Sequence, residues 1–228
     1  MRALARAIDH LDLPAVEKIA EESQEHPFDV LISTMLSAQT RDPVTAAAAG
    51  RLFRRARTPR TMARLAVKEI ERLIYPVSFY RHKAKHVKQT CEILVDRYKG
   101  RVPGTMEELL TLPGVGRKTA NLVLILSFKS LQNICVDTHV HRISNRLGWV
   151  NTRTPEQTEQ ALYAATDRRW WPSVNLYLVT WGQNVCRPVY PRCGECVIYE
   201  HCARVGVERA SGTRADSTPR TQRKDSKA

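Results

Sequence analysis

The sequence predicts an all-α protein. Apolar residues recur at helical spacing along most of the chain, several stretches open on residues that start helices, and no stretch alternates apolar and polar residues as a half-buried strand does. The chain has 228 residues, of which 43% are hydrophobic, so it can bury a core without disulfides. That length suits one large domain or two small lobes.

Six stretches along the chain have this helical character. The first and the third open with Pro14 and Pro43, residues that suit the first turn of a helix. The fourth spaces its apolar groups, from Met62 to Ile74, close to a helical period. The six stretches are 14–23, 28–38, 43–54, 60–74, 83–98 and 156–167.

A further helix is predicted in the segment 103–129. Thr105, with Glu108 three residues later, forms a capping-box pattern, so a helix is expected to begin near Met106. It is expected to end before Pro113, because the residue preceding a proline is disfavoured in the α region.

The same segment then predicts a tight turn and a second helix. Gly114 and Gly116 flank Val115 in the turn, and a nearly all-apolar helix is expected from Arg117. Helix, hairpin and helix together expose backbone N–H groups at a helix N-terminus, which binds a phosphate without reading base sequence. The alternative is a plain interhelical turn.

The charge balance favours the phosphate-binding interpretation. Lys and Arg number 36 against 23 Asp and Glu, a net charge of +13. Residues 211–228 account for +3, which leaves +10 on the rest of the chain. A body this basic points to a polyanionic partner, nucleic acid first and an acidic membrane second. Residues 208–228 are polar and basic, and we expect a disordered tail there.

The sequence gives no sign of membrane insertion or export. The longest aliphatic run, residues 122–126, is far shorter than the roughly 18 to 20 residues that a span needs. Charges at Arg2, Arg6, Asp9 and Asp12 leave no apolar stretch for a signal peptide. We therefore expect a cytoplasmic protein whose thiols stay reduced.

Lys118 is the candidate nucleophile. It lies in the first turn of the second predicted helix, beside Arg117, where the helix dipole and the neighbouring cation both disfavour an ammonium. A neutral amine there could attack an electrophilic carbon and form a Schiff base. The alternative is a surface lysine that contacts phosphate.

Asp137 is the candidate partner of Lys118. It lies between an apolar run and a predicted helix that begins at Thr138 and ends at Gly148. A carboxylate there could accept the lysine proton or stabilise a developing sugar cation. The alternative is a helix cap, and the two roles are compatible because a capping carboxylate is held in one orientation.

Four cysteines near the C-terminus are the candidate metal ligands. Cys186, Cys193, Cys196 and Cys202 have the spacing C-x6-C-x2-C-x5-C. In a reducing compartment this spacing indicates a metal site rather than disulfides, and both zinc and a 4Fe-4S cluster accept four thiolates. Arg187 and Arg192 lie in the first loop of this site, which predicts a basic surface facing DNA.

These motifs together resemble the endonuclease III family. The resemblance rests on LPGVGRKTAN at 112–121, VDTH at 136–139, the four-cysteine loop at 186–202, LSAQT at 36–40 and FYRHKA at 79–84. It extends from about residue 10 to 205 and implies a helix–hairpin–helix DNA glycosylase and AP lyase with a 4Fe-4S cluster.

The resemblance implies two helical lobes with a DNA cleft between them. One lobe is a six-helix barrel, expected at residues 20–131. The other joins residues 1–19 to 132–207 and holds the cluster. The implied activity is base excision repair: removal of oxidised pyrimidines from double-stranded DNA, then cleavage of the abasic strand by β-elimination. A monomer associated with the nucleoid is the corresponding expectation.

The resemblance also assigns roles to individual residues. Lys118 matches the Schiff-base lysine and Asp137 the catalytic aspartate. Gln39 matches the side chain that fills the space left by the flipped nucleotide, and Phe79 falls where the family places an apolar wedge. Phe79 departs from the family, since many bacterial members have Gly-Leu-Tyr where this chain has Ser-Phe-Tyr. Asp42 and His139 match positions near the pocket.

Three alternatives remain at this stage. The nearest is a monofunctional mismatch or uracil glycosylase on the same scaffold, but such enzymes usually have serine or tyrosine where Lys118 stands. A non-catalytic DNA-binding module would use the hairpin and the cysteine loop for docking alone. A zinc-stapled structural protein would be colourless.

Overall fold

The computed structural model describes residues 1–211, and these residues contain helices and no strand, as the sequence predicts. They form two compact units. We call Leu13–Cys135 the hairpin unit, and we call Met1–Asp12 together with the chain from Val136 onward the cysteine unit. The expected boundary at residue 19 would have cut through helix α2 (Ala15–Glu22), which instead belongs whole to the hairpin unit.

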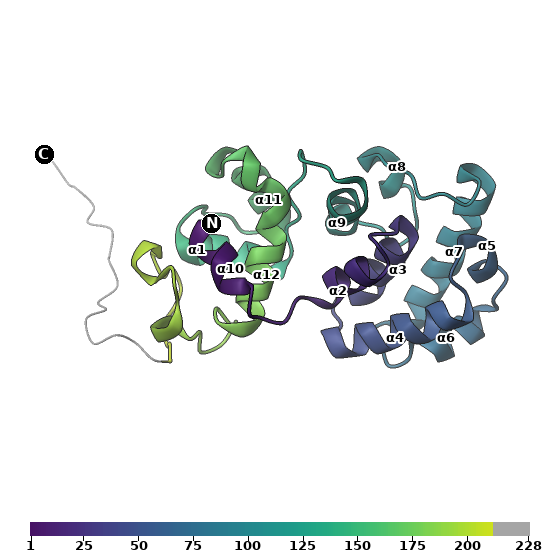
Figure 1. Ribbon diagram of the computed structural model, residues 1–228, viewed down its shortest axis with the longest axis horizontal. Coiled ribbons are helices and arrows are strands. Elements are labelled where there is room, and N and C mark those ends of the chain that lie inside the picture. Colours follow the sequence, from purple (N-terminus) through teal and green to yellow (C-terminus); the bar gives the residue numbers. More distant parts are fainter. Residues whose placement is uncertain (212–228) are drawn as a thin grey trace, which may run out of the picture. The chain divides into compact units, whose positions relative to one another are not determined.

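Helix α3 (Pro27–Ser37) is the centre of the hairpin unit (Figure 1). Every residue from 28 to 36 is buried, because α2, α4 (Asp42–Arg55), α7 (Tyr80–Tyr98) and α9 (Arg117–Phe128) all pack against it. A helix with apolar residues on every side is stable only when it is enclosed in this way. Its one buried carboxylate, Asp29, pairs with Arg57 at 2.9 Å.

The stretch 60–74 is not one helix, which corrects the sequence prediction. It forms a single turn, α5 (Pro59–Met62), and a separate helix, α6 (Val67–Ile74). The break lies at Ala66, whose backbone is extended with φ −68° and ψ 146°, so the chain leaves the helical conformation between the two helices. Both helices pack against α7. Helix α8 (Met106–Leu110) packs against α9.

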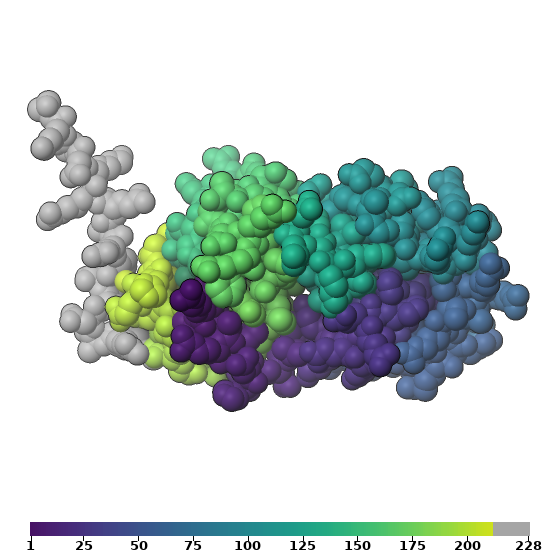
Figure 2. Space-filling model, turned by 45° about the horizontal axis from the view of Figure 1, so that its top comes forward, coloured from purple at the N-terminus to yellow at the C-terminus, as the bar shows by residue number. Residues whose placement is uncertain are grey.

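Helix α12 (Val174–Asn184) is the centre of the cysteine unit. It packs against α1 (Arg2–Ile8), α10 (Thr138–Leu147) and the 3-10 segment η1 (Arg168–Ser173), and α11 (Pro155–Ala165) packs against α10. Figure 2 shows residues 1–12, in dark purple, against the green residues of this unit. The sequence does not predict helix α12. The helix is almost completely buried, so it has no polar face whose spacing would show a helical period.

The chain after α12 is mostly irregular. It contains two short 3-10 turns, η2 (Cys193–Glu195) and η3 (Tyr199–His201). Ser211 returns to this region, where its N–H donates to the carbonyl of Pro191 at 3.0 Å. Most of the expected tail, residues 212–228, lies outside the described residues. Within the described part of the chain, no helix is long and apolar enough to cross a membrane.

Candidate functional site

The predicted hairpin is present between α8 and α9. Helix α8 begins at Met106 and α9 at Arg117, which confirms the sequence prediction. The hydroxyl of Thr90 on α7 donates to the carbonyl of Pro113 at 3.0 Å. Gly114 has φ +76°, and a Cβ at this position would lie 2.8 Å from Nδ1 of His86. Only glycine fits both the backbone conformation and the contact with α7.

The N-terminus of α9 is open. Gly116 occupies the N-cap position without a capping side chain, and a Cβ there would meet nothing within 4 Å. The side chain of Val115 is buried in the core, so this residue presents only its backbone. Arg117 is exposed at the first helical position. The hairpin therefore offers uncapped N–H groups and a nearby cation to an anion.

Lys118 occupies the second position of α9 and is half-buried. Its carbonyl accepts a hydrogen bond from the thiol of Cys135 at 3.4 Å, which ties the first turn of α9 to the chain that leaves the hairpin unit. This bond anchors the turn that carries Lys118, and a side chain on an anchored turn has a more restricted position.

Asp137 is the N-cap of α10, as the sequence predicts. Its Oδ1 accepts hydrogen bonds from the N–H groups of His139 at 2.8 Å and Val140 at 2.9 Å. Both bonds go to one oxygen, so the carboxylate is fixed in orientation while Oδ2 receives neither capping bond. The cap and a chemical role can therefore coexist in one side chain.

The two residues matched to pocket positions both have structural contacts. Asp42 is the first residue of α4, and its Oδ2 accepts a hydrogen bond from the N–H of Ala15 at 2.9 Å. His139 lies against Gly182, and its Nδ1 is 3.1 Å from Nη2 of Arg142. Each side chain thus supports the packing of its own unit.

Gln39 and Phe79 are two of the eight non-glycine residues with a positive φ in the described part of the chain. Gln39 has φ +54° just after α3, and Phe79 has φ +55° just before α7. The Phe79 side chain is 63% exposed. Non-glycine residues with positive φ cost about 1–3 kcal/mol each and concentrate at functional sites. Thr40 brings the two together, since its Oγ1 accepts the N–H of Ser78 at 3.2 Å.

Sequence reasoning missed Lys83, a buried lysine that contacts the segments containing Gln39 and Phe79. It lies in α7, and its Nζ contacts the chain around Gln39. The available signal was its position, because Lys83 falls on the apolar stripe of α7 with Val87, Cys91 and Leu94. A lysine on such a stripe needs buried acceptors.

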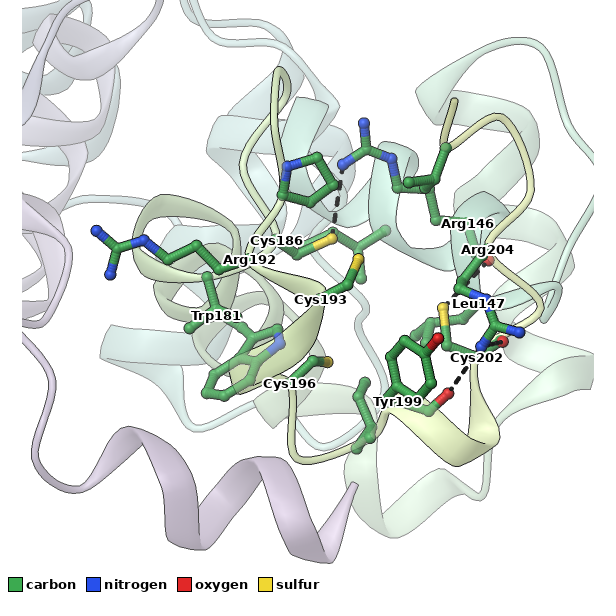
Figure 3. Close-up of a pocket in the computed structure, with 15 residues that line it drawn as sticks. Arg146, Leu147, Trp181, Cys186, Arg192, Cys193, Cys196, Tyr199, Cys202 and Arg204 are labelled. Atoms are coloured by element: carbon green, nitrogen blue, oxygen red, sulfur yellow. Dashed lines mark hydrogen bonds between the residues drawn. The ribbon is translucent and has the colours of Figure 1, made fainter. Parts of the chain in front are cut away.

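The four cysteines line one pocket of the cysteine unit (Figure 3). None forms a disulfide. Across residues 1–211, no group of three or more His, Cys, Asp or Glu side chains is arranged so that it could hold a metal ion. The pocket wall is otherwise largely apolar, and Arg146 supplies a cation whose Nη1 lies 3.6 Å from Sγ of Cys186.

Two buried donors also line this pocket. The hydroxyl of Tyr199 has no hydrogen-bond partner in the described part of the chain, and the indole N–H of Trp181 interacts with the thiol of Cys196. Burial raises the pKa of the Cys193, Cys196 and Cys202 thiols, and repulsion from neighbouring thiolates raises it further. A positively charged centre would stabilise thiolates at these three positions.

The two arginines of the cysteine loop differ in their surroundings. Arg187 is exposed, and its carbonyl accepts a hydrogen bond from Arg146 at 2.7 Å. Arg192 forms a 3.5 Å ion pair with Glu195, and its side chain points away from the sulfurs in Figure 3. Arg187 is the better placed of the two to meet a phosphate.

Comparison with known proteins gives one consistent result. The profile of the HhH-GPD superfamily of base excision DNA repair proteins matches residues 32–167. The chain is 47% identical over 196 residues to a Thermotoga maritima protein named endonuclease III, covering 86% of this chain and 92% of that protein. It is 45% identical over 202 residues to endonuclease III-like protein 1 of Gallus gallus, covering 85% and 72% respectively.

A solved structure agrees with the sequence matches. The structure of a trapped endonuclease III–DNA covalent intermediate superposes with a TM-score of 0.73 at 32% sequence identity. The match covers 82% of this chain and 92% of that one.

The two hairpin glycines provide a test of the open N-terminus. Gly114→Ala should lower the free energy of unfolding by about 1–3 kcal/mol, because it strains a positive φ and crowds His86. Gly116→Ala should change stability by less than about 0.5 kcal/mol yet weaken binding to duplex DNA, since its Cβ occupies the space that a phosphate would enter. Urea unfolding and a titration with fluorescent DNA measure the two effects. Wild-type affinity in Gly116→Ala would place the hairpin away from DNA.

Proposed function

Since the chain belongs to the HhH-GPD superfamily of base excision DNA repair proteins, and within it to the endonuclease III family, we propose that it excises oxidised pyrimidines through Lys118. It is a base-excision-repair DNA glycosylase and AP lyase. The observation that carries the proposal is Lys118 in the first turn of α9, directly after an uncapped hairpin. Its substrate is double-stranded DNA with a damaged base or an abasic site, which supports action at the nucleoid.

The chemistry assigned to Lys118 is a displacement followed by an elimination. Its neutral Nζ attacks the C1′ atom of the damaged nucleoside while the bond from C1′ to the base breaks. Loss of the amine proton and opening of the sugar ring give a Schiff base between Nζ and C1′. Removal of a C2′ proton then expels the 3′-phosphate by β-elimination, which nicks the strand. The damaged nucleotide must first leave the base stack to reach the amine.

Asp137 supports the displacement step. Its carboxylate either accepts the proton that Nζ loses or stabilises the positive charge that develops on the sugar. The two N–H bonds to Oδ1 support this assignment, because they fix the carboxylate and leave Oδ2 for the reaction.

Gln39 and Phe79 are assigned to the DNA stack. An exposed aromatic ring can enter between base pairs as an apolar wedge, and a neighbouring amide can occupy the space of the flipped nucleotide. The exposure of Phe79 and the shared positive φ of the two residues support this assignment.

We assign a 4Fe-4S cluster to the pocket of Cys186, Cys193, Cys196 and Cys202. The donor set matches such a cluster in number and type, since four cysteines line one pocket, and the unpartnered hydroxyl of Tyr199 could donate to a cluster sulfur. When bound, the cluster supplies a covalent link among four positions of the loop. Zinc remains the second candidate, because four thiolates also suit that ion.

Lys118→Ala should abolish strand nicking and borohydride trapping on a duplex with one thymine glycol, while duplex affinity stays close to wild type. The reason is that the variant loses the only amine proposed to bond with the sugar. Lys129→Ala is the matched control, because it removes an equal charge from the other end of α9. A Lys118→Ala protein that still forms the adduct would overturn the assignment. A wild-type protein that leaves alkali-labile sites without an adduct would be a monofunctional glycosylase.

Asp137→Asn should slow base excision by about 10²- to 10⁴-fold, as expected for loss of a general base or a charge stabiliser. Stability should be kept, because asparagine caps helices as well as aspartate does. Asp167→Asn makes the same change at the N-cap of η1 and serves as the control. Single-turnover excision and thermal unfolding are the measurements. Unchanged excision would mean that Asp137 is a cap and nothing more.

Cys202→Ser should remove the broad visible absorbance expected of an iron–sulfur protein and lower the thermal stability of the cysteine unit. Cys91→Ser replaces a buried thiol of the hairpin unit and should keep the absorbance. Elemental analysis of the wild type is expected to find iron and sulfide. A colourless wild-type protein with one zinc per chain would replace the cluster by a zinc site.

A further inference from the structure

The end of α3 leads directly into the chain that carries Gln39. The helix ends at Ser37, and the next residue, Ala38, is already extended with ψ 119°. Carbonyls at the end of a helix have no partner within the helix and need donors from elsewhere. Here the donor is a side chain of α7: the ammonium of Lys83 donates to the carbonyls of Leu36 and Ala38.

Lys83 donates three hydrogen bonds to acceptors at the end of α3 and in the segment that follows it. Its Nζ lies 2.7 Å from the Leu36 carbonyl, 2.6 Å from the Ala38 carbonyl and 3.2 Å from Oγ1 of Thr40. An ammonium has three donors, and all three are used. The acceptors lie on both sides of Gln39, so the bonds fix the chain before and after the residue with positive φ.

The same lysine is connected to Phe79. The backbone N–H of Lys83 donates to the Phe79 carbonyl at 3.0 Å in the first turn of α7. Thr40, which contacts the Lys83 ammonium, also accepts the N–H of Ser78 at 3.2 Å. Lys83 thus connects two segments that are 40 residues apart in sequence and that each contain one strained, exposed residue.

Burying the Lys83 ammonium opposes folding, which indicates that this lysine does more than cap the end of α3. Lys83 is only 9% exposed, and burial lowers its pKa to about 8, so at pH 7 the charged form still predominates. Burial of a charge and two non-glycine residues with positive φ all oppose folding. A helix end can be satisfied without any of these, by a glycine and local backbone bonds.

We propose that Lys83 is a positioning residue that holds Gln39 and Phe79 together in the conformations with which they enter DNA. This inference rests on the function proposed for those two residues. Lys83 is buried and does not itself reach the substrate. Its effect is to set both side chains before DNA arrives, so that no free energy of binding is needed to order them.

The test follows insertion into DNA directly. Lys83→Met keeps the length of the side chain and removes its donors, and Lys85→Met removes an equal charge from an exposed position on the same helix. Both variants are bound to a duplex in which 2-aminopurine faces a stable abasic analogue, since 2-aminopurine fluorescence rises when its neighbours are unstacked. Excision kcat and KM on thymine glycol DNA and affinity for undamaged duplex are measured in parallel.

Lys83→Met should lose most of the fluorescence rise and reduce kcat by about 10- to 100-fold, with little change in KM or in undamaged-duplex affinity. Lys85→Met should match wild type in fluorescence and kcat. A lower melting temperature alone, with fluorescence and kcat equal to those of Lys85→Met, would make Lys83 a helix cap and overturn the proposal. A wild-type protein that neither excises nor traps would instead refute the proposed function.

Thr40→Val keeps the proposal testable if Lys83→Met does not fold. It removes one acceptor of Lys83 and the link to Ser78, and it leaves the two carbonyl bonds of the lysine in place. A partial loss of the fluorescence rise is expected. A full wild-type signal in Thr40→Val would contradict the proposed coupling between the two segments.

Discussion

The hydrogen bonds of Lys83 at the end of α3 are the interaction on which the candidate DNA-facing surface of the hairpin unit depends. Helix α3 is buried on all sides, so the chain must leave the core abruptly after Ser37. An apolar side chain at position 83 would leave the buried Leu36 carbonyl without a partner, at a cost of about 1–3 kcal/mol, and would leave the Ala38 carbonyl with only the Thr40 hydroxyl at 3.2 Å. The ammonium removes that cost and fixes the exposed residues at the same time.

Two helix N-termini of the molecule are treated in opposite ways. The N-terminus of α10 is capped by Asp137, whose Oδ1 accepts the N–H groups of the second and third residues of the helix. The N-terminus of α9 has no capping side chain, and Gly116 leaves the space before it open. A closed terminus holds a carboxylate still, whereas an open one attracts an anion. The contrast separates the residue proposed to act in the chemistry from the backbone proposed to bind DNA.

Local signals in the sequence are enough to predict much of the fold. Capping and turn residues place α8, the hairpin, α9 and α10 correctly, because a cap or a glycine acts within a few residues. The break at residues 63–66 and the buried α12 are not predicted. At the break, the apolar residues of two short helices together have the spacing of one longer helix. In α12, burial leaves no polar face, so the apolar spacing of a helix cannot be recognised.

The residues of the candidate site also differ in whether local sequence signals predict them. Lys118, Asp137 and the four cysteines are recognisable from motifs because their neighbours in sequence are also their neighbours in space. Lys83 is not, because its acceptors lie more than 40 residues away and become visible only when α7 is packed against α3. A charged residue on an apolar stripe marks the position but not its partner.

The cysteine loop shows why an additional link is needed in this part of the chain. Between residues 186 and 211 the only helical segments are η2 and η3, and few apolar side chains other than Ile198 and Tyr199 are buried. A segment with so little core cannot offset the entropy of ordering its backbone by apolar burial alone. Arg146 contributes by donating to the carbonyls of Arg187 and Pro188, both at 2.7 Å. Four thiolates on one cluster would join the remaining positions, so that the exposed Arg187 is carried on an ordered loop rather than on a mobile one.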